Sequence, residues 1–409
     1  MKKYFLLILC LFLAVSLFPN SGQQQATIIN VAVPVRVLDG GSFIDTVSKD
    51  DFELYENGIL QKIDALYLIK NTAAERREAG RDFDPLLSRT FYFLFQLTDW
   101  DSNLGDAIEY FFNDVFLPGD SLVIMTPERT FRLSPEGFAA KTKDETSKEL
   151  IKILRKDIQL GNSRYKTTMR NLRRLVGEIK SASGVTSPQA SPEQSLDMGF
   201  SDASLSLELL LPRYANAIQE MDELRFVDQQ TFISFAGALK KQLNQKNVYL
   251  FYQREFRPEI NPSLLTEIMM NYQDKPHVLG KLTEIFDLYK RDSPFDGNQI
   301  NQAFADSSLL FNFIFTDRIA ERFAGIFMRE QSEDIFKVFS EAARATGGVV
   351  ENSQNLAKGF KTAAEISSQY YLLYYSPVNY VKDGSYKSIE VKVKNQNYSI
   401  TNRKGYFAR

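Results

Sequence analysis

The most constraining feature of this 409-residue chain is a pair of apolar runs that each stop abruptly at a glutamine. The first run spans Arg89–Gln96 and leads into Leu97–Trp100, and the second spans Asn247–Gln253 and leads into Arg254 and Glu255. Continuous runs of β-branched and aromatic residues are typical of strands buried on both faces of a parallel sheet. In open α/β sheets, ligands bind at the carboxyl ends of such strands. We therefore expect the functional edge of the molecule to lie where these two runs end.

The order of the segments predicts an α/β fold with a doubly wound, mainly parallel sheet flanked by helices. Helical spacing of apolar residues follows the first run at 104–115 and recurs at 147–160 and 167–180. We place this domain at 89–368, with a helical insertion at about 181–245. The segment 181–199, rich in Ser, Pro, Gly and Gln, is expected to be a flexible loop.

The two ends of the chain carry strand signals of a different kind. Alternating valines at 31–37 and the Asn57–Gly58 turn signal predict an N-terminal β unit at 23–70, and a charged linker at 71–88 follows it. Further alternating strands are expected at 369–409. We expect the two ends to pack together as one small β-rich unit.

The N-terminus has the pattern of a signal peptide. Lys2 and Lys3 precede an apolar stretch at 4–18, and small or polar residues near Gly22 offer a cleavage site, which gives a signal peptide at 1–22. The stretch is shorter than the roughly 20 residues that a membrane span needs. The chain is thus expected to be exported, periplasmic or secreted, without stable membrane insertion after cleavage; a retained anchor is the alternative. The only cysteine, Cys10, lies inside this stretch, so the remaining chain has no disulfide or thiol chemistry.

Composition excludes several classes of function. A formal net charge of −2 gives no general electrostatic basis for nucleic-acid binding. No glycine-rich phosphate loop occurs, and His277 is the only histidine, so no cofactor, His-based zinc site or Ser-His-Asp triad is expected. The segment 141–180 has twelve Lys and Arg against five Asp and Glu. It is either a solvated helical surface or a docking face for an acidic partner.

Several segments resemble one family when they are taken in order along the chain. Phe93–Ala107 resembles the first strand, loop and helix of a von Willebrand factor type A domain. Residues 31–39 and 46–58, and the closing segments 345–348, 371–377 and 403–408, are similar to bacterial secreted VWFA-related proteins. The resemblance spans most of the chain after the signal peptide.

The resemblance implies a metal site whose acids are missing. The family holds a divalent cation with Asp-x-Ser-x-Ser, a Thr from a second loop and an Asp after a later strand. At these positions the chain has, in order, Gln96, Thr98, Trp100, Ser163 and Gln253. Mg²⁺ and Ca²⁺ prefer sites that include carboxylates, and Trp100 supplies no oxygen. No metal is therefore expected at these positions.

These observations favour a non-enzymatic, exported protein-binding or scaffolding module whose partner the sequence does not name. Its binding rim is expected at the carboxyl ends of the strands. The rim residues are Thr98, Asp99, Trp100, Asp101, Ser102, Ser163, Tyr165, Gln253 and Glu255. Within this rim, Asp101 or Ser102 is a candidate helix cap. Trp100 is either an exposed binding anchor or a side chain folded into the vacated metal position.

Two alternatives use acids that have shifted along the rim. In the first, Asp99, Asp101 and Asp317 bind a divalent cation, and the protein is a cation-dependent adhesin. In the second, the same three acids support a metal-dependent hydrolase.

Overall fold

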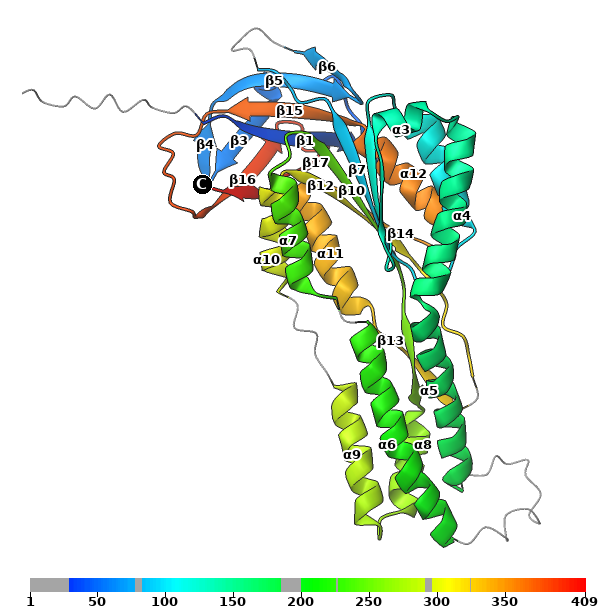
Figure 1. Ribbon diagram of the computed structural model, residues 1–409. Helices are drawn as coiled ribbons and strands as arrows, with labels where there is room; N and C mark the ends of the chain where they lie inside the picture. Colours follow the sequence, from blue (N-terminus) through cyan, green and yellow to red (C-terminus); the bar gives the residue numbers. More distant parts are fainter. Residues whose placement is uncertain (1–28, 78–82, 185–199, 226, 291–295, 324) are drawn as a thin grey trace, which may run out of the picture.

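The computed structural model describes residues 29–77, 83–184, 200–225, 227–290, 296–323 and 325–409. Its centre is a six-stranded sheet (Figure 1). The strands are, in spatial order, β14 (Val350–Ser353), β12 (Leu309–Thr316), β10 (Gln245–Gln253), β7 (Arg89–Gln96), β8 (Ser121–Met125) and β9 (Thr130–Leu133). The first five are parallel, and β9 is antiparallel to β8. The register sets Gln96 opposite Tyr252 and Gln253 opposite Thr316, so both glutamines lie at the carboxyl edge.

Helices bury both faces of this sheet, which explains why its strands are continuously apolar. Alternate residues such as Phe93 and Phe251 face one layer of helices, and Leu94 and Leu250 face the other. The first layer is α2 (Asn103–Tyr110), with its π-helical continuation η3 (Phe111–Val115), α3 (Pro135–Ala139), α4 (Lys143–Gly161) and α12 (Leu356–Ser367). The second layer is α7 (Gln229–Lys240), α10 (Gly297–Asp306) and α11 (Glu333–Thr346).

Two antiparallel sheets come from the ends of the chain. One has six strands: β1 (Val31–Asp39), β2 (Ser42–Phe43), β5 (Ile63–Lys70), β6 (Ala73–Arg76), β15 (Gln369–Tyr375) and β17 (Ser399–Asn402). The other has four: β3 (Phe52–Glu56), preceded by the 3-10 turn η2 (Lys49–Asp51), β4 (Ile59–Gln61), β16 (Tyr386–Val393) and β18 (Gly405–Phe407). β1 pairs with both β15 and β17, so the two chain ends do pack together. Asn57 and Gly58 make the β3–β4 turn with φ angles of 48° and 77°, the conformation that Asn-Gly favours.

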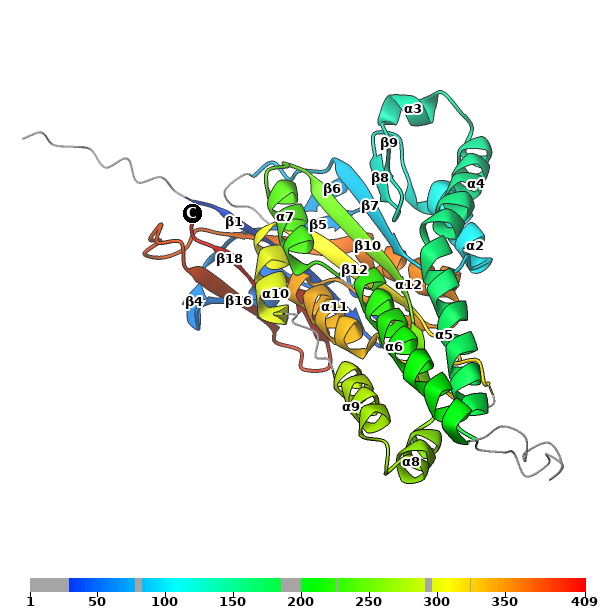
Figure 2. The same ribbon diagram turned by 60° about the horizontal axis from the view of Figure 1, so that its bottom comes forward.

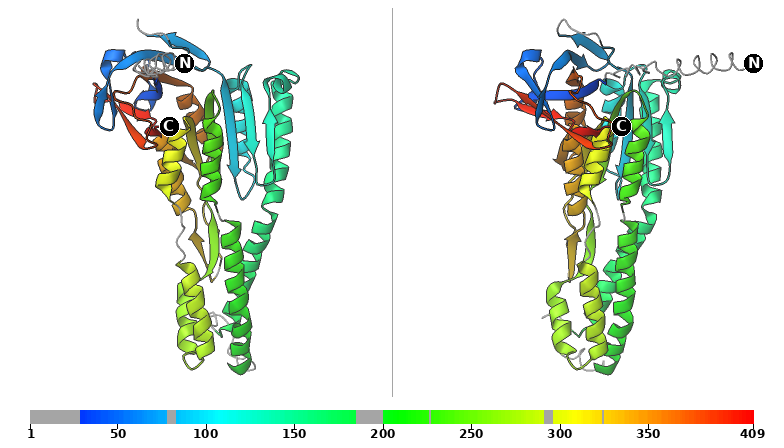
Figure 3. Two further views of the ribbon diagram at one scale, coloured as in Figure 1. Left: turned by 60° about the vertical axis from the view of Figure 1, so that its left-hand side comes forward. Right: turned by 90° about the vertical axis from the view of Figure 1, so that its left-hand side faces the viewer.

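A helical extension projects beyond the carboxyl edge of the central sheet (Figures 1 and 3). It consists of α5 (Ser163–Ala182), α6 (Phe200–Leu224), α8 (Pro262–Asn271), α9 (Pro276–Tyr289) and a two-stranded ribbon of β11 (Phe256–Ile260) and β13 (Ile326–Glu330). Its apolar side chains form a core of their own, in which Leu172, Leu211 and Leu282 are buried. The apolar faces of these helices therefore pack against one another and not against the sheet.

The predicted fold class was wrong. The central sheet is mixed, because the β8–β9 connection has only four residues and so returns the chain antiparallel. The other three sheets are antiparallel throughout, and the largest of them has as many strands as the central one. The molecule is a mixed α/β protein with much antiparallel sheet, and not a doubly wound parallel sheet with a small β appendage.

Several expected boundaries also differ from the observed ones. The helical extension begins at Ser163 and takes in α8 and α9, so it is larger than the insertion expected at about 181–245. β6 lies inside the segment expected to be a linker. The expected signal peptide and residues 185–199 of the expected loop lie outside the described residues. Within the described ranges, no helix has the length and apolar character required to cross a membrane.

Candidate functional site at the carboxyl edge

Gln253, which stands at one of the metal-ligand positions of the family that the chain resembles, is engaged within the protein. It is buried, and its Oε1 accepts hydrogen bonds from the Thr98 backbone N at 3.1 Å, the Thr98 hydroxyl at 2.8 Å and the Asp99 backbone N at 3.0 Å. An oxygen that already accepts three hydrogen bonds has no lone pair left for a cation. The amide therefore fixes the loop after β7 to the end of β10.

Asp99, the first of the shifted acids, is held by two cations. Lys166 Nζ from α5 lies 2.6 Å from Asp99 Oδ1, and Arg318 Nη1 lies 3.1 Å from Asp99 Oδ2. The same Arg318 nitrogen donates to the Thr98 hydroxyl at 3.2 Å. A guanidinium and an ammonium thus supply the positive charge that a divalent cation would otherwise bring to this carboxylate.

The other acids at this edge also have protein partners. Asp317 Oδ1 lies 3.0 Å from Arg254 Nη1. Asp101 Oδ1 accepts from the Asn103 backbone N at 2.8 Å, so it caps the start of α2, as one interpretation of the sequence proposed. Ser102, at the N-cap position of α2, makes no side-chain hydrogen bond to the helix. Among the described residues, no three His, Cys, Asp or Glu side chains gather closely enough to hold a metal ion.

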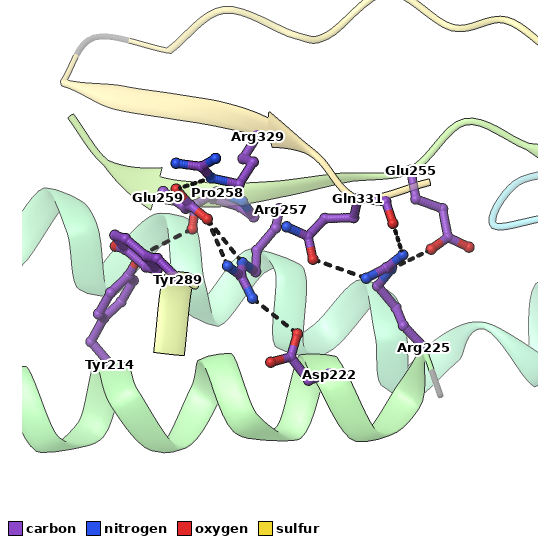
Figure 4. A network of polar contacts seen from close by, with 10 residues as sticks. All are labelled: Tyr214, Asp222, Arg225, Glu255, Arg257, Pro258, Glu259, Tyr289, Arg329 and Gln331. Carbon is purple, nitrogen blue, oxygen red and sulfur yellow. Dashed lines mark hydrogen bonds and ion pairs between the residues drawn. The ribbon is translucent and has the colours of Figure 1, made fainter. Parts of the chain in front are cut away.

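Glu255 anchors the helical extension to the sheet through a buried ion pair. Arg225, just after α6, places Nε 2.5 Å from Glu255 Oε2 and Nη1 2.9 Å from Gln331 Oε1 (Figure 4). Burial is the largest single influence and would lower the pKa of Arg225, but Glu255, Tyr252 and Asp334 together outweigh it and raise this pKa. Removing either partner would leave an uncompensated buried charge.

A second group of ion pairs continues this contact along the ribbon. Arg257 Nη1 lies 2.9 Å from Asp222 Oδ1 and its Nη2 lies 2.7 Å from Glu259 Oε1, while Arg329 Nε lies 2.7 Å from Glu259 Oε2 (Figure 4). Tyr214 and Tyr289 close the end of the group with hydroxyls 2.6 Å apart. The root of the extension is therefore a polar junction with structural contacts on every charged side chain that Figure 4 draws.

The remaining rim residues do not form one binding surface. Trp100 is half-buried and packs against the core between the sheet and the first layer of helices, so it is not a freely exposed anchor, and nothing in these contacts places it in the vacated metal position. Tyr165 packs against the core of the extension, and burial raises its pKa well above the usual value. Ser163 is exposed; its neighbour Asn162 makes the contact to the β7 loop, with Nδ2 2.6 Å from the Leu97 carbonyl oxygen.

The residues present do not fit the metal that the resemblance implied. The amide oxygen of Gln253 already accepts three hydrogen bonds, and the Trp100 side chain has no oxygen. The carboxylate of Asp99 is paired with two cationic side chains. Lys166, Arg318 and Asn162 complete this arrangement, and sequence reasoning missed all three. The signal that could have found Lys166 was the basic segment 141–180, which the sequence analysis had noted. Arg318 directly follows Asp317, one of the acids that the sequence analysis named.

A different part of the same edge is open. A cavity of about 510 Å³ lies between the ends of β7, β8 and β10 on one side and α7 on the other. Its walls are mainly apolar and include Leu94, Met125, Phe232 and Phe235. Gln96, which is exposed, is one of the few polar residues in its lining. The strand that ends at Gln96, where the family's first acid is missing, therefore ends beside an apolar pocket.

Comparison of the chain with protein-family models, with curated proteins and with solved structures found no match in any of the three.

Proposed function

We propose that the chain is an exported, non-enzymatic protein-binding module that works without a metal ion. The export rests on the signal-peptide pattern of Lys2, Lys3 and the apolar stretch at 4–18. The binding role is assigned to the apolar edge pocket and no longer to the rim of acids. One observation carries this assignment: at the carboxyl edge the charged groups are paired within the protein, whereas the pocket beside Gln96 is open and apolar.

The dimensions of the pocket fit an anchoring side chain of a protein partner. Ligand pockets commonly enclose roughly 300–1,000 Å³ and combine apolar walls with a few polar groups. Here Phe232 and Phe235 of α7 face Leu94 and Met125 across the pocket, and Gln96 and Asp228 contribute polar groups. A buried aromatic or aliphatic anchor in such a pocket supplies much of the affinity of a protein interface. We therefore assign the pocket to an apolar residue of the partner, flanked by a segment able to hydrogen-bond with Gln96.

Selection of displayed peptides against residues 23–409 tests this function. We expect enriched peptides to share an aromatic or large aliphatic residue, and Met125→Glu to weaken their binding by about tenfold or more, because it places a carboxylate in the apolar pocket. Leu209→Glu is the matched control, since Leu209 is exposed on α6, outside the pocket. Met125→Gln and a urea unfolding curve for each variant separate lost binding from lost folding.

Two outcomes would contradict the proposal. Peptides that bind Met125→Glu as tightly as the parent would show that the pocket is not the binding site. Hydrolytic turnover that disappears with Asp99→Asn or Asp317→Asn would show that the protein is an enzyme and that the acids act on a substrate.

A further inference from the structure

A second cavity lies at the opposite, amino edge of the central sheet. It encloses about 470 Å³ between the ends of α7 and α10, the starts of β10 and β12, and strands of the two terminal sheets. Figure 2 shows α7 and α10 beside the terminal strands, and the Phe407 backbone N donates to Asp306 Oδ1 at 2.8 Å across this junction. The cavity contains several basic side chains and few acidic ones.

Lys246 is a buried cation with no acidic partner among the described residues. Its side chain lies at the start of β10 and the residue is 5% exposed. Its ammonium donates to the carbonyl oxygen of Gln242 at 3.1 Å. A neutral acceptor of this kind does not offset the cost of removing a full charge from water.

Arg403 is the second buried cation in the wall of the cavity. The residue is 7% exposed, Nη1 donates to the Ser308 hydroxyl, and the guanidinium lies 5.6 Å from the centre of the Tyr406 ring. Its Nε is buried and has no hydrogen-bond partner in the described structure. This nitrogen is therefore available to donate a hydrogen bond to a bound acceptor.

The other charges of the cavity do not neutralise these two. Asp306 is engaged by Lys240, whose Nζ lies 2.8 and 2.7 Å from its two oxygens. The carboxyl ends of α7 and α10 also face this region, and each contributes roughly half a negative charge. Arg36 also lines the cavity and adds a further positive charge, so the helix ends do not neutralise Lys246 and Arg403.

We propose that this cavity is an anion site that binds a small molecule through a phosphate or carboxylate group placed between Lys246 and Arg403. The anion would accept from the Lys246 ammonium and from the free Nε of Arg403, and the apolar walls near Leu309 and Leu372 would contact the rest of the ligand. The site does not depend on the proposed protein-binding pocket, which lies at the other edge of the sheet.

The acid–base properties of Lys246 agree with this assignment. Burial, and after it the nearby charge of Arg403, lower the pKa of Lys246 to about 8. A bound anion stabilises the charged ammonium and must therefore raise that pKa.

Thermal unfolding of residues 23–409 in inorganic phosphate, acetate or chloride at matched ionic strength tests the site. We expect phosphate, acetate or both to raise Tm by several degrees relative to chloride. Lys246→Met should remove this response, and Lys241→Met should keep it, since Lys241 is exposed and lies only five residues away. A response to phosphate alone identifies a phosphate site, and a response to acetate alone identifies a carboxylate site.

A second measurement on the unsubstituted chain covers the case in which Lys246→Met does not fold. NMR of ¹³C-methylated lysines should show one resonance that titrates near pH 8 and moves to higher pH in phosphate or acetate. The same Tm in all three salts, an equal response of Lys246→Met, or an unmoved Lys246 titration would overturn the proposal and leave the two cations a purely structural role at the helix ends.

Discussion

The two edges of the central sheet differ in whether their charged side chains are paired. At the carboxyl edge, Asp99, Glu255 and Asp317 each face a lysine or arginine at 3.1 Å or less. In the cavity at the amino edge, Lys246 and Arg403 are buried and face no such partner among the described residues. The acids of the carboxyl edge are therefore paired with cations, whereas the two buried cations of the amino edge have no acidic partner among the described residues.

This difference shows which charged groups of the molecule are structural. Paired buried charges fix one element to another, and they are costly to break because a single partner is left behind. Uncompensated buried charges destabilise a fold, so they persist where a ligand or a reaction requires them. The carboxyl edge, where the sequence placed the site, is therefore held mainly by structural contacts, and the amino edge becomes a candidate for binding.

The largest expected effect comes from breaking the ion pair of Glu255 at the carboxyl edge. Glu255→Gln leaves Arg225 buried without its counter-ion, so we expect the free energy of unfolding to fall by about 3–5 kcal/mol in urea titrations at neutral pH. Glu178→Gln is the control, because Glu178 pairs with Arg174 on the surface of α5 and such pairs contribute less than about 0.5 kcal/mol. Equal effects of the two substitutions would show that the Glu255 pair is no more structural than a surface pair.

A smaller effect should appear when the amino edge is titrated. Burial lowers the folded-state pKa of Lys246 from the ordinary lysine value of 10.5 to about 8, so between these values the unfolded chain binds more protons than the folded one. Stability must therefore rise with pH across this window, by at most about 1.4 kcal/mol per pH unit from one group. The difference between urea titrations of the parent and Lys246→Met should show this slope, and Lys241→Met should not change it. A flat difference curve would mean that Lys246 is not desolvated.

The sequence was informative wherever a pattern is local. The apolar runs ending at Gln96 and Gln253 predicted two buried parallel strands, and the structure shows that these strands also pair with each other. Asn57–Gly58 predicted a turn because few residues tolerate positive φ at both positions. Asp101 was named as a possible cap, and it caps α2.

The sequence failed wherever the answer depends on contacts between distant segments. Hydropathy does not encode which strands pair or how large a sheet they form, so the extent of the antiparallel terminal sheets went unrecognised in the fold class. Amphipathic helices were predicted, but no pattern tells whether an apolar face will pack on a sheet or on other helices, as those of the extension do. Arg318 lies 219 residues from Asp99, and no local sequence pattern predicts that the two side chains pair.

The smallest expected effect tests whether the carboxyl edge is truly closed to cations. Asp99 is 44% exposed as a side chain, and its partners Lys166 and Arg318 are similarly accessible, so Asp99→Asn should cost no more than about 1 kcal/mol in urea titrations. Because both carboxylate oxygens already contact protein cations, millimolar Mg²⁺, Ca²⁺ or Mn²⁺ should leave the Tm measured in EDTA unchanged within about one degree. Lys166→Met is the companion variant. It removes the lysine contact to one carboxylate oxygen of Asp99 and adds no new metal ligand. A Tm increase of several degrees in the parent chain, lost in Asp99→Asn or Asp317→Asn, would mean that a divalent cation displaces these arginine and lysine contacts. The carboxyl edge would then bind a cation, and its contrast with the amino edge would no longer hold. The cation-dependent adhesin would become the better explanation of the rim.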